Sequence, residues 1–274
     1  MSDFGVLAIV IGLGLCVGSF LNVCIYRLPS GASLLRPRSR CPGCEYQLRW
    51  YDNIPVISYL LLFGRCRSCR SRINLRYPIV EILTAVVFVL HYALFGLTAL
   101  MAVRVLFACA LIVLFAIDLE HQILPNVITL PGIVAGLVFS LVLPPGVFDA
   151  VLGVLIGGGV LWLIGEAYYR FAGQEGMGGG DVKMLAMVGA FLGWKQVLVT
   201  LVVSSVTGSF LGVLLILARR GNLKQALPFG TFIAIGALLA SLVGERIVQW
   251  YAGMYVLTFH GSKHLIALLT ASLR

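Results

Sequence analysis

The sequence predicts an all-α, polytopic integral membrane protein of about eight transmembrane helices, with one polar loop that contains four cysteines. Three observations carry this prediction: an apolar composition, long apolar runs, and a polar segment confined to one region. The 274 residues have a mean hydropathy of +1.00, and only 11% of them are charged, whereas about 25% is usual for soluble domains. An ordinary soluble domain is therefore excluded.

A helix needs roughly 20 apolar residues to cross the hydrocarbon of a bilayer. Eight apolar runs are candidates, at about residues 4–24, 78–96, 98–117, 127–143, 147–167, 182–193, 197–218 and 229–250. The sixth run is short for a full span, so we expect it to pack as a partial or tilted helix. The first run has no basic region before it and no small-residue cleavage site after it, so we expect it to remain as a span rather than act as a cleaved signal peptide.

The distribution of charge predicts the orientation. Residues 27–76 contain ten arginines and two acids, Glu45 and Asp52, so this segment holds +8 of the net charge of +9. Because basic loops stay in the cytoplasm, we expect the N-terminus outside and this loop inside, together with residues 118–126, 168–181 and 219–224. Basic residues beside a membrane favour anionic lipid or an acidic partner. Since no nucleic-acid recognition motif is present, no nucleic acid is expected.

Pairs of glycines four residues apart recur within the apolar runs. This spacing lets helix backbones approach closely in lipid, so we interpret the pairs as helix-packing positions. They are Gly14/Gly18, Gly132/Gly136, Gly153/Gly157, Gly189/Gly193 and Gly208/Gly212.

The basic loop contains two C-x-x-C pairs, Cys41/Cys44 and Cys66/Cys69, separated by 21 residues. Four thiolates at this spacing predict a structural zinc site, and hence a zinc-ribbon-like cytoplasmic loop. The alternative is two disulfides, which need an oxidising compartment rather than the cytosol. The stretch WYDNIP, residues 50–55, either packs on the zinc knuckles or lies at the membrane interface. The other cysteines are expected to be small buried hydrophobes: Cys16, Cys24 and Cys109.

Acids near membrane spans are costly and are functional candidates by default. Glu166 and Glu245 lie near the ends of their runs, where they can reach water. Glu81 lies one turn into the second run, where it either pairs with an arginine such as Arg76 or helps to hold a ligand.

Asp118 and Asp181 differ from the other acids because the expected topology brings both to the cytoplasmic face. Asp118 ends an apolar run and Asp181 begins one, 63 positions later. Two neighbouring carboxylates can share a proton, so that one activates a water and the other polarises a carbonyl, as in an aspartic protease. The alternatives are an N-cap for Asp181 and a boundary polar residue for Asp118. Glu120 points to a different side of a helix and is the weaker partner.

Two other functions compete with proteolysis. A transporter would also carry membrane carboxylates, but it gives the cysteine loop no role. A scaffold with a zinc loop would use the aspartates only as helix caps. A phosphate cradle in the glycine-rich stretch before Asp181 is disfavoured, because the Walker spacing and its lysine are absent.

Four stretches occur in the order seen in bacterial type IV prepilin peptidases, a family of membrane aspartyl proteases with a GxGD motif. They are GSFLNVCIYRLP (residues 18–29), the paired CxxC loop, IDLEHQILPN (residues 117–126) and GGGDVKM (residues 178–184). This set closely resembles that family and covers about two thirds of the chain. The family pattern often has Asp where this chain has Asn126.

The resemblance implies a bifunctional enzyme of the bacterial inner membrane. It implies cleavage of the basic leader of type IV prepilins or type II secretion pseudopilins after a glycine, followed by N-methylation with S-adenosylmethionine. It places the catalytic pair at Asp118 and Asp181, with zinc on the four loop cysteines. Gly64 matches a position linked to methyl transfer, and Glu81 is the further candidate there. Residues 1–77 would then serve methyl transfer, and residues 78–274 would form the peptidase.

Overall fold

The structure, a computed structural model, describes residues 3–36, 38–173, 178–218 and 228–271. Within these ranges the chain is helical and has no β-strand, only two isolated bridges in the cysteine loop. This confirms the all-α prediction. The elements are α1 (Asp3–Arg27), η1 (Trp50–Asn53), α2 (Ile57–Leu61), α3 (Arg76–Phe95), α4 (Ala99–His121), α5 (Asn126–Phe139), α6 (Val147–Ala172), α7 (Gly179–Leu192), α8 (Trp194–Leu217) and α9 (Phe229–Ala271).

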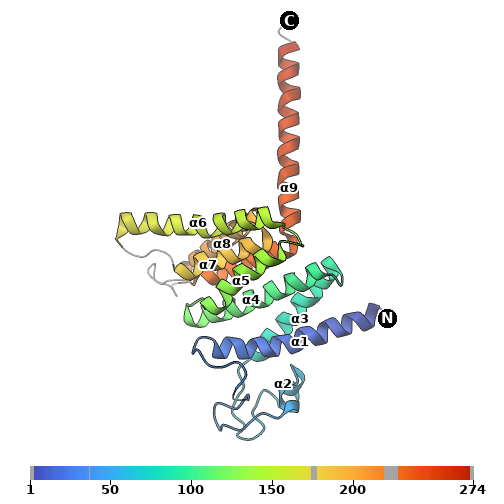
Figure 1. Cartoon of the computed structure of the whole chain (residues 1–274), viewed down its shortest axis with the longest axis vertical. Helices are drawn as coiled ribbons and strands as arrows, with labels where there is room; N and C mark the ends of the chain where they lie inside the picture. The colour runs from blue at the N-terminus through green and yellow to red at the C-terminus, as the bar shows by residue number, and fades with distance from the viewer. Residues whose placement is uncertain (1–2, 37, 174–177, 219–227, 272–274) are drawn as a thin grey trace.

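The helices stack side by side, and the cysteine loop lies outside the stack next to α1 and α3 (Figure 1). The end of α1, the end of α4 and the start of α7 lie on one side of the stack, the side from which the cysteine loop leaves. The C-terminal part of α9 projects away from the other helices.

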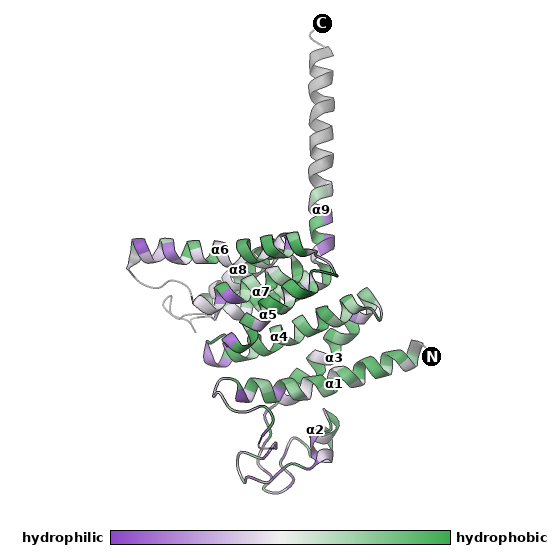
Figure 2. Ribbon diagram, in the orientation of Figure 1, coloured by the Kyte–Doolittle hydropathy of each residue, from purple (hydrophilic) through white to green (hydrophobic). Residues whose placement is uncertain are grey.

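Within the described ranges, six helices are long and apolar enough to cross a membrane by length and composition, so the chain is an integral membrane protein. The count of eight spans is not confirmed, because α5 and α7 have only 14 residues each. At 1.5 Å per residue, such a helix is about 21 Å long, which is less than the hydrocarbon thickness. Figure 2 shows apolar residues along the helices and polar ones in the cysteine loop.

The membrane-type character also appears in the side chains that face outward. Val202, Val206 and Phe210 follow one face of α8 and are 63%, 62% and 71% exposed, a pattern that suits contact with lipid rather than water. Cys24 and Cys109 are buried as expected, but Cys16 is exposed. The expectation for Cys16 was wrong because its side of α1 is left without a neighbouring helix.

α4 is the central helix because it contributes to both hydrophobic cores. Ile112 and Ile117 pack with residues of α1 and α3, whereas Phe107 and Leu114 pack with residues of α7 and α9. Residues 116–118 of α4, which include Asp118, are consequently buried, whereas the last three residues of the helix are exposed.

The glycine pairs lie mostly where helices touch, as predicted. A methyl group at Gly189 of α7 would lie 2.1 Å from the Gly153 carbonyl of α6, and one at Gly14 would lie 2.6 Å from Cα of Ala85 in α3. Gly193 has a different role, since it caps α7 with a φ of +82°. Residues 174–177 and 219–224, which belong to two of the expected inner loops, lie outside the described residues.

Candidate active site and metal centre

The four loop cysteines come together in space. Their sulfurs all lie within 4.8 Å of one another; the Cys41 and Cys69 sulfurs are 3.8 Å apart, and those of Cys44 and Cys66 are 4.0 Å apart. A tetrahedral zinc with Zn–S bonds of about 2.3 Å places its sulfurs about 3.8 Å apart. The four thiols are free, and their separations are far longer than the roughly 2 Å of a disulfide. The cluster therefore has the shape of a four-sulfur metal site.

The two knuckles that carry these cysteines have nearly the same backbone. In the first knuckle, the backbone N–H of Cys41 donates to the carbonyl of Tyr46, and the N–H of Glu45 donates to the carbonyl of Cys41. In the second knuckle, the N–H of Cys66 donates to the carbonyl of Ser71, and the N–H of Arg70 donates to the carbonyl of Cys66. Glu45 and Arg70, each just after the second cysteine, have φ values of 55° and 60°. Such turns point two sulfurs from each knuckle toward one centre.

The electrostatics of the cluster also suit a metal. Burial alone raises the pKa of the Cys41 thiol, but hydrogen bonds from the Gly43 backbone, the Ser71 hydroxyl and the Cys44 backbone lower it to about 6. The Ser71 hydroxyl likewise lowers the pKa of Cys69. The Tyr46 backbone lowers the pKa of Cys44, yet burial and the neighbouring sulfurs raise it to about 11. Four thiols this close ionise together only if a cation compensates their charge.

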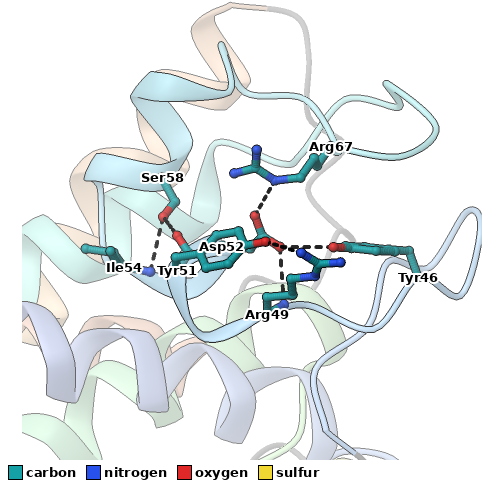
Figure 3. Close-up of polar contacts among 7 residues, drawn as sticks. All are labelled: Tyr46, Arg49, Tyr51, Asp52, Ile54, Ser58 and Arg67. Carbon is teal, nitrogen blue, oxygen red and sulfur yellow. Dashed lines mark hydrogen bonds and ion pairs between the residues drawn. The ribbon is translucent and has the colours of Figure 1, made fainter.

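Asp52 is the polar core of the loop, and the sequence analysis did not single it out. Its side chain is only 1% exposed. It accepts hydrogen bonds from Arg67 Nε at 2.6 Å, from the Arg49 backbone N–H at 3.2 Å and from the Tyr46 hydroxyl at 3.5 Å (Figure 3). Tyr46 and Arg67 belong to different knuckles, so Asp52 ties the two together. The available signal was that Asp52 is one of only two acids among ten arginines.

The same stretch links the loop to the membrane helices. The hydroxyl of Ser58 donates to the carbonyl of Tyr51 and accepts from the backbone N–H of Ile54 (Figure 3). The backbone N–H of Val56 then donates to the carboxylate of Glu81 at 2.8 Å. Through Asp52 this stretch contacts both knuckles, and through Val56 it reaches α3.

Glu81 is buried in α3 at the foot of this link, 7% exposed. Of the two predicted roles, the pairing with Arg76 is wrong, because Arg76 turns toward α4 and forms an ion pair with Glu120. The same pair directs Glu120 away from Asp118, as the sequence predicted. Glu81 instead accepts the Val56 N–H, so one of its functions is to anchor the loop.

Gly64 lies in the second knuckle and is buried, with a φ of +64°. A methyl group there would lie 2.7 Å from the hydroxyl of Tyr59. Both the left-handed backbone and the contact with Tyr59 require glycine at this position.

Asp118 is held by the start of α9. Its carboxylate is buried, 4% exposed, and its Oδ2 atom accepts hydrogen bonds from the Thr231 backbone N–H at 2.7 Å and the Thr231 hydroxyl at 2.9 Å. Thr231 was missed by sequence reasoning, since nothing in the sequence joins two residues 113 positions apart.

Asp181 lies in the first turn of α7, directly after Gly180. The positions of Gly180 and Gly230 both border the side chain of Leu124, and that of Gly230 also borders the Asp118 carboxylate. The N-cap interpretation of Asp181 is wrong, because α7 begins at Gly179 and its N-cap is Gly178. Gly179 and Gly180 start the helix two residues before Asp181 and three residues before the apolar run. A negative charge in the first turn of a helix is favoured by the helix dipole.

The side chain of Leu124 lies between Gly180, which precedes Asp181, and Gly230, which borders the Asp118 carboxylate. A methyl group at Gly180 would lie 2.9 Å from Cβ of Leu124, and one at Gly230 would lie 2.8 Å from Cδ1 of the same side chain. Asn126, where this chain departs from the common pattern, accepts a hydrogen bond from Lys183 at 2.9 Å and so joins α5 to α7. Small and polar residues thus bring α4, α5, α7 and α9 together around the two aspartates.

Comparison with known proteins agrees with the two parts of this structure. Residues 12–95 match the bacterial peptidase A24 N-terminal domain, and residues 105–213 match the type IV leader peptidase family. The prepilin leader peptidase/N-methyltransferase of Aeromonas hydrophila is 38% identical over 265 residues, which cover 86% of this chain and 90% of the relative. The protein of the same name from Pseudomonas aeruginosa is 36% identical, over 87% of this chain and 91% of the relative. The one from Legionella pneumophila is 35% identical, over 90% of this chain and 95% of the relative.

No solved structure matches the chain. The relatives nevertheless cover nearly the whole sequence, and the two matched domains include the cysteine loop and both aspartates. The chain therefore belongs to the type IV leader peptidase family.

Proposed function

We propose that this protein cuts the basic leader from type IV prepilins or type II secretion pseudopilins, after a glycine, and then methylates the new N-terminal amine. The names of the relatives combine a prepilin leader peptidase with an N-methyltransferase. The structure supports the proposal with two separate polar centres, the cysteine loop and the pair of aspartates.

What supports the peptidase is that the end of α4, which carries Asp118, and the start of α7, which carries Asp181, lie on the same side of the helix stack. In the proposed reaction one carboxylate takes a proton from water while the water oxygen bonds to the scissile carbonyl carbon. The other carboxyl group gives its proton to the carbonyl oxygen, and the C–N bond then breaks as the leaving amine takes up a proton. The transporter alternative has no use for the loop.

The proposed methyl donor is S-adenosylmethionine. Residues 1–77 are proposed to carry out methyl transfer, and residues 78–274 to form the peptidase. The free amine produced by cleavage attacks the donor's methyl group, the carbon–sulfur bond breaks, and the amine releases a proton. Gly64 and Glu81 are the proposed residues for this step. Both act on the shape of the loop, since Gly64 contacts Tyr59 and Glu81 holds the Val56 backbone.

The loop cysteines, Cys41, Cys44, Cys66 and Cys69, are the proposed ligands of a structural zinc. The N-terminus is proposed to lie outside the inner membrane, with the loop and both aspartates at the cytoplasmic face. A substrate leader that begins in the cytosol would meet the aspartates on that face, and the arginines of the loop would contact anionic lipid or the donor's carboxylate.

Replacement of either aspartate tests the peptidase. We expect Asp118→Asn and Asp181→Asn to lower prepilin cleavage at least about a thousandfold, while methylation of a pre-cleaved peptide persists. Asp149→Asn is the matched control. Asp149 is also an acid in the first turn of a helix, α6, but it is not one of the proposed catalytic residues. Wild-type cleavage by either of the first two variants would refute the catalytic pair.

A further inference from the structure

The start of α9 makes an unusual contact with the proposed active site. Thr231 gives both of its donors, the backbone N–H and the hydroxyl, to the same oxygen of Asp118, at 2.7 and 2.9 Å. Both residues are buried, 5% and 4% exposed. Hydrogen bonds to a carboxylate are stronger than those between neutral groups, particularly where water is excluded.

The neighbouring glycine brings this contact close. A methyl group at Gly230 would lie 2.9 Å from Oδ2 of Asp118 and 2.8 Å from Cδ1 of Leu124. Any side chain at position 230 would displace the carboxylate or the leucine. The backbone of α9 therefore lies directly against the Asp118 carboxylate.

The two bonds restrict how the carboxylate can turn. Both end on Oδ2, and among the described residues no hydrogen bond is formed by Oδ1. With Oδ2 fixed, the second oxygen keeps one direction and remains available for a water or a shared proton. Among the described residues, Asp181 lies in the first turn of the neighbouring helix α7, while Arg76 and Glu120 pair with each other and Lys183 bonds Asn126.

We propose that Thr231 is the positioning residue of the peptidase: its hydroxyl and backbone N–H hold Asp118 in the orientation that catalysis requires. This inference rests on the proposed role of Asp118. Because Thr231 acts through Asp118, its loss reduces the rate of cleavage and leaves substrate binding and methyl transfer unchanged.

The test compares three threonine variants of the full-length protein in membranes. Thr231→Val removes the hydroxyl, and we expect kcat for prepilin cleavage to fall by about ten- to a hundredfold, the effect of one lost hydrogen bond to a charged group, with KM unchanged. Thr231→Ser keeps the hydroxyl and restores cleavage. Thr207→Val is the matched control, because the Thr207 hydroxyl bonds only carbonyls of its own helix, those of Val203 and Ser204.

Methylation of a pre-cleaved peptide, measured on the same preparations, reports whether each variant is folded. Gly230→Ala provides an independent arm and is expected to slow cleavage as well, because its methyl group displaces the carboxylate. Thr231→Val activity equal to that of Thr207→Val, or no rescue by serine, overturns the inference. Asp118→Asn is assayed in parallel: if it cleaves normally, the proposed catalytic pair fails, whereas if only the Thr231 variants cleave normally, the positioning role alone fails.

Discussion

At the scale of single residues, the structure of the loop depends on a glycine, Gly64, and on a buried carboxylate, Asp52. Gly64 combines a φ of +64° with a contact that leaves no room for a methyl group beside the Tyr59 hydroxyl. Gly31 has nearly the same backbone, with a φ of +65°, but nothing lies within 4 Å of the position that a methyl group would take there. A substitution at Gly31 therefore tests backbone strain alone, whereas one at Gly64 tests strain together with the steric contact.

Gly64→Ala is predicted to lower methylation more than cleavage. A non-glycine residue in such a backbone costs about 1–3 kcal/mol, and the clash with Tyr59 adds to this cost at position 64 alone. Gly31→Ala introduces only the strain, so it should retain more methyl transfer. Parallel assays of both reactions check this; equal methylation in the two variants would exclude the contact with Tyr59 as the cause.

Asp52→Asn is predicted to destabilise the loop by about 1–3 kcal/mol, because Arg67 loses its buried ionic partner. Glu45→Gln is the control within the same loop: Glu45 is 79% exposed and its ion pair with Arg40 is 3.8 Å long. Limited proteolysis and retention of metal by the two purified variants measure the difference. Indistinguishable behaviour would show that Asp52 does not hold the knuckles together.

At the scale of elements, α6 and α7 touch through glycine. Gly153 and Gly189 face each other so closely that a methyl group at Gly189 would lie 2.1 Å from the Gly153 carbonyl. Gly189→Ala is predicted to separate the two helices and to destabilise the protein by about 1–3 kcal/mol. Gly159→Ala in α6, with nothing within 4 Å, should be neutral or slightly stabilising. Thermal unfolding in detergent compares them, and equal midpoints would contradict the packing role.

At the scale of the whole molecule, the chain combines two parts with different sources of stability. The membrane helices have two hydrophobic cores. Between α1 and α3, by contrast, only Cys41, Ser58, Gly64 and Cys66 are buried as whole residues among those described, and the one buried charged side chain described above is that of Asp52. A segment that buries so little apolar surface would gain much of its stability from the proposed zinc, so the two parts are expected to respond differently to a chelator.

Removal of zinc from the full-length protein with a chelator is predicted to abolish methylation and to leave most of the cleavage. Cys41→Ser should behave in the same way, whereas Cys16→Ser, outside the cluster, should keep its zinc and both activities. Acidification should also weaken metal binding, because protons compete for the sulfurs. Metal analysis and the two assays on one preparation check this. Loss of cleavage at the same rate as methylation would show that the parts are not separate.

The sequence by itself determined the helical membrane class, the position of the polar loop and the residues with the capacity for chemistry. These features depend on composition and local spacing: apolar runs must be helical in lipid, and two C-x-x-C pairs place four sulfurs at ligand spacing. It also indicated that the sixth run, which forms α7, is too short for a full span. It could not determine that α5 would end at Phe139, or that α7 would begin two residues before Asp181, since glycines permit several local conformations.

Only the tertiary structure decided which distant groups meet. Arg76 pairs with Glu120 rather than Glu81, Asp52 joins two knuckles, and Thr231 reaches Asp118 across 113 positions. Each of these contacts depends on how helices and turns pack, and packing is set by the shape of many side chains at once. The sequence shows which residues can react, and the packing of α4 against α9 decides how Asp118 is held.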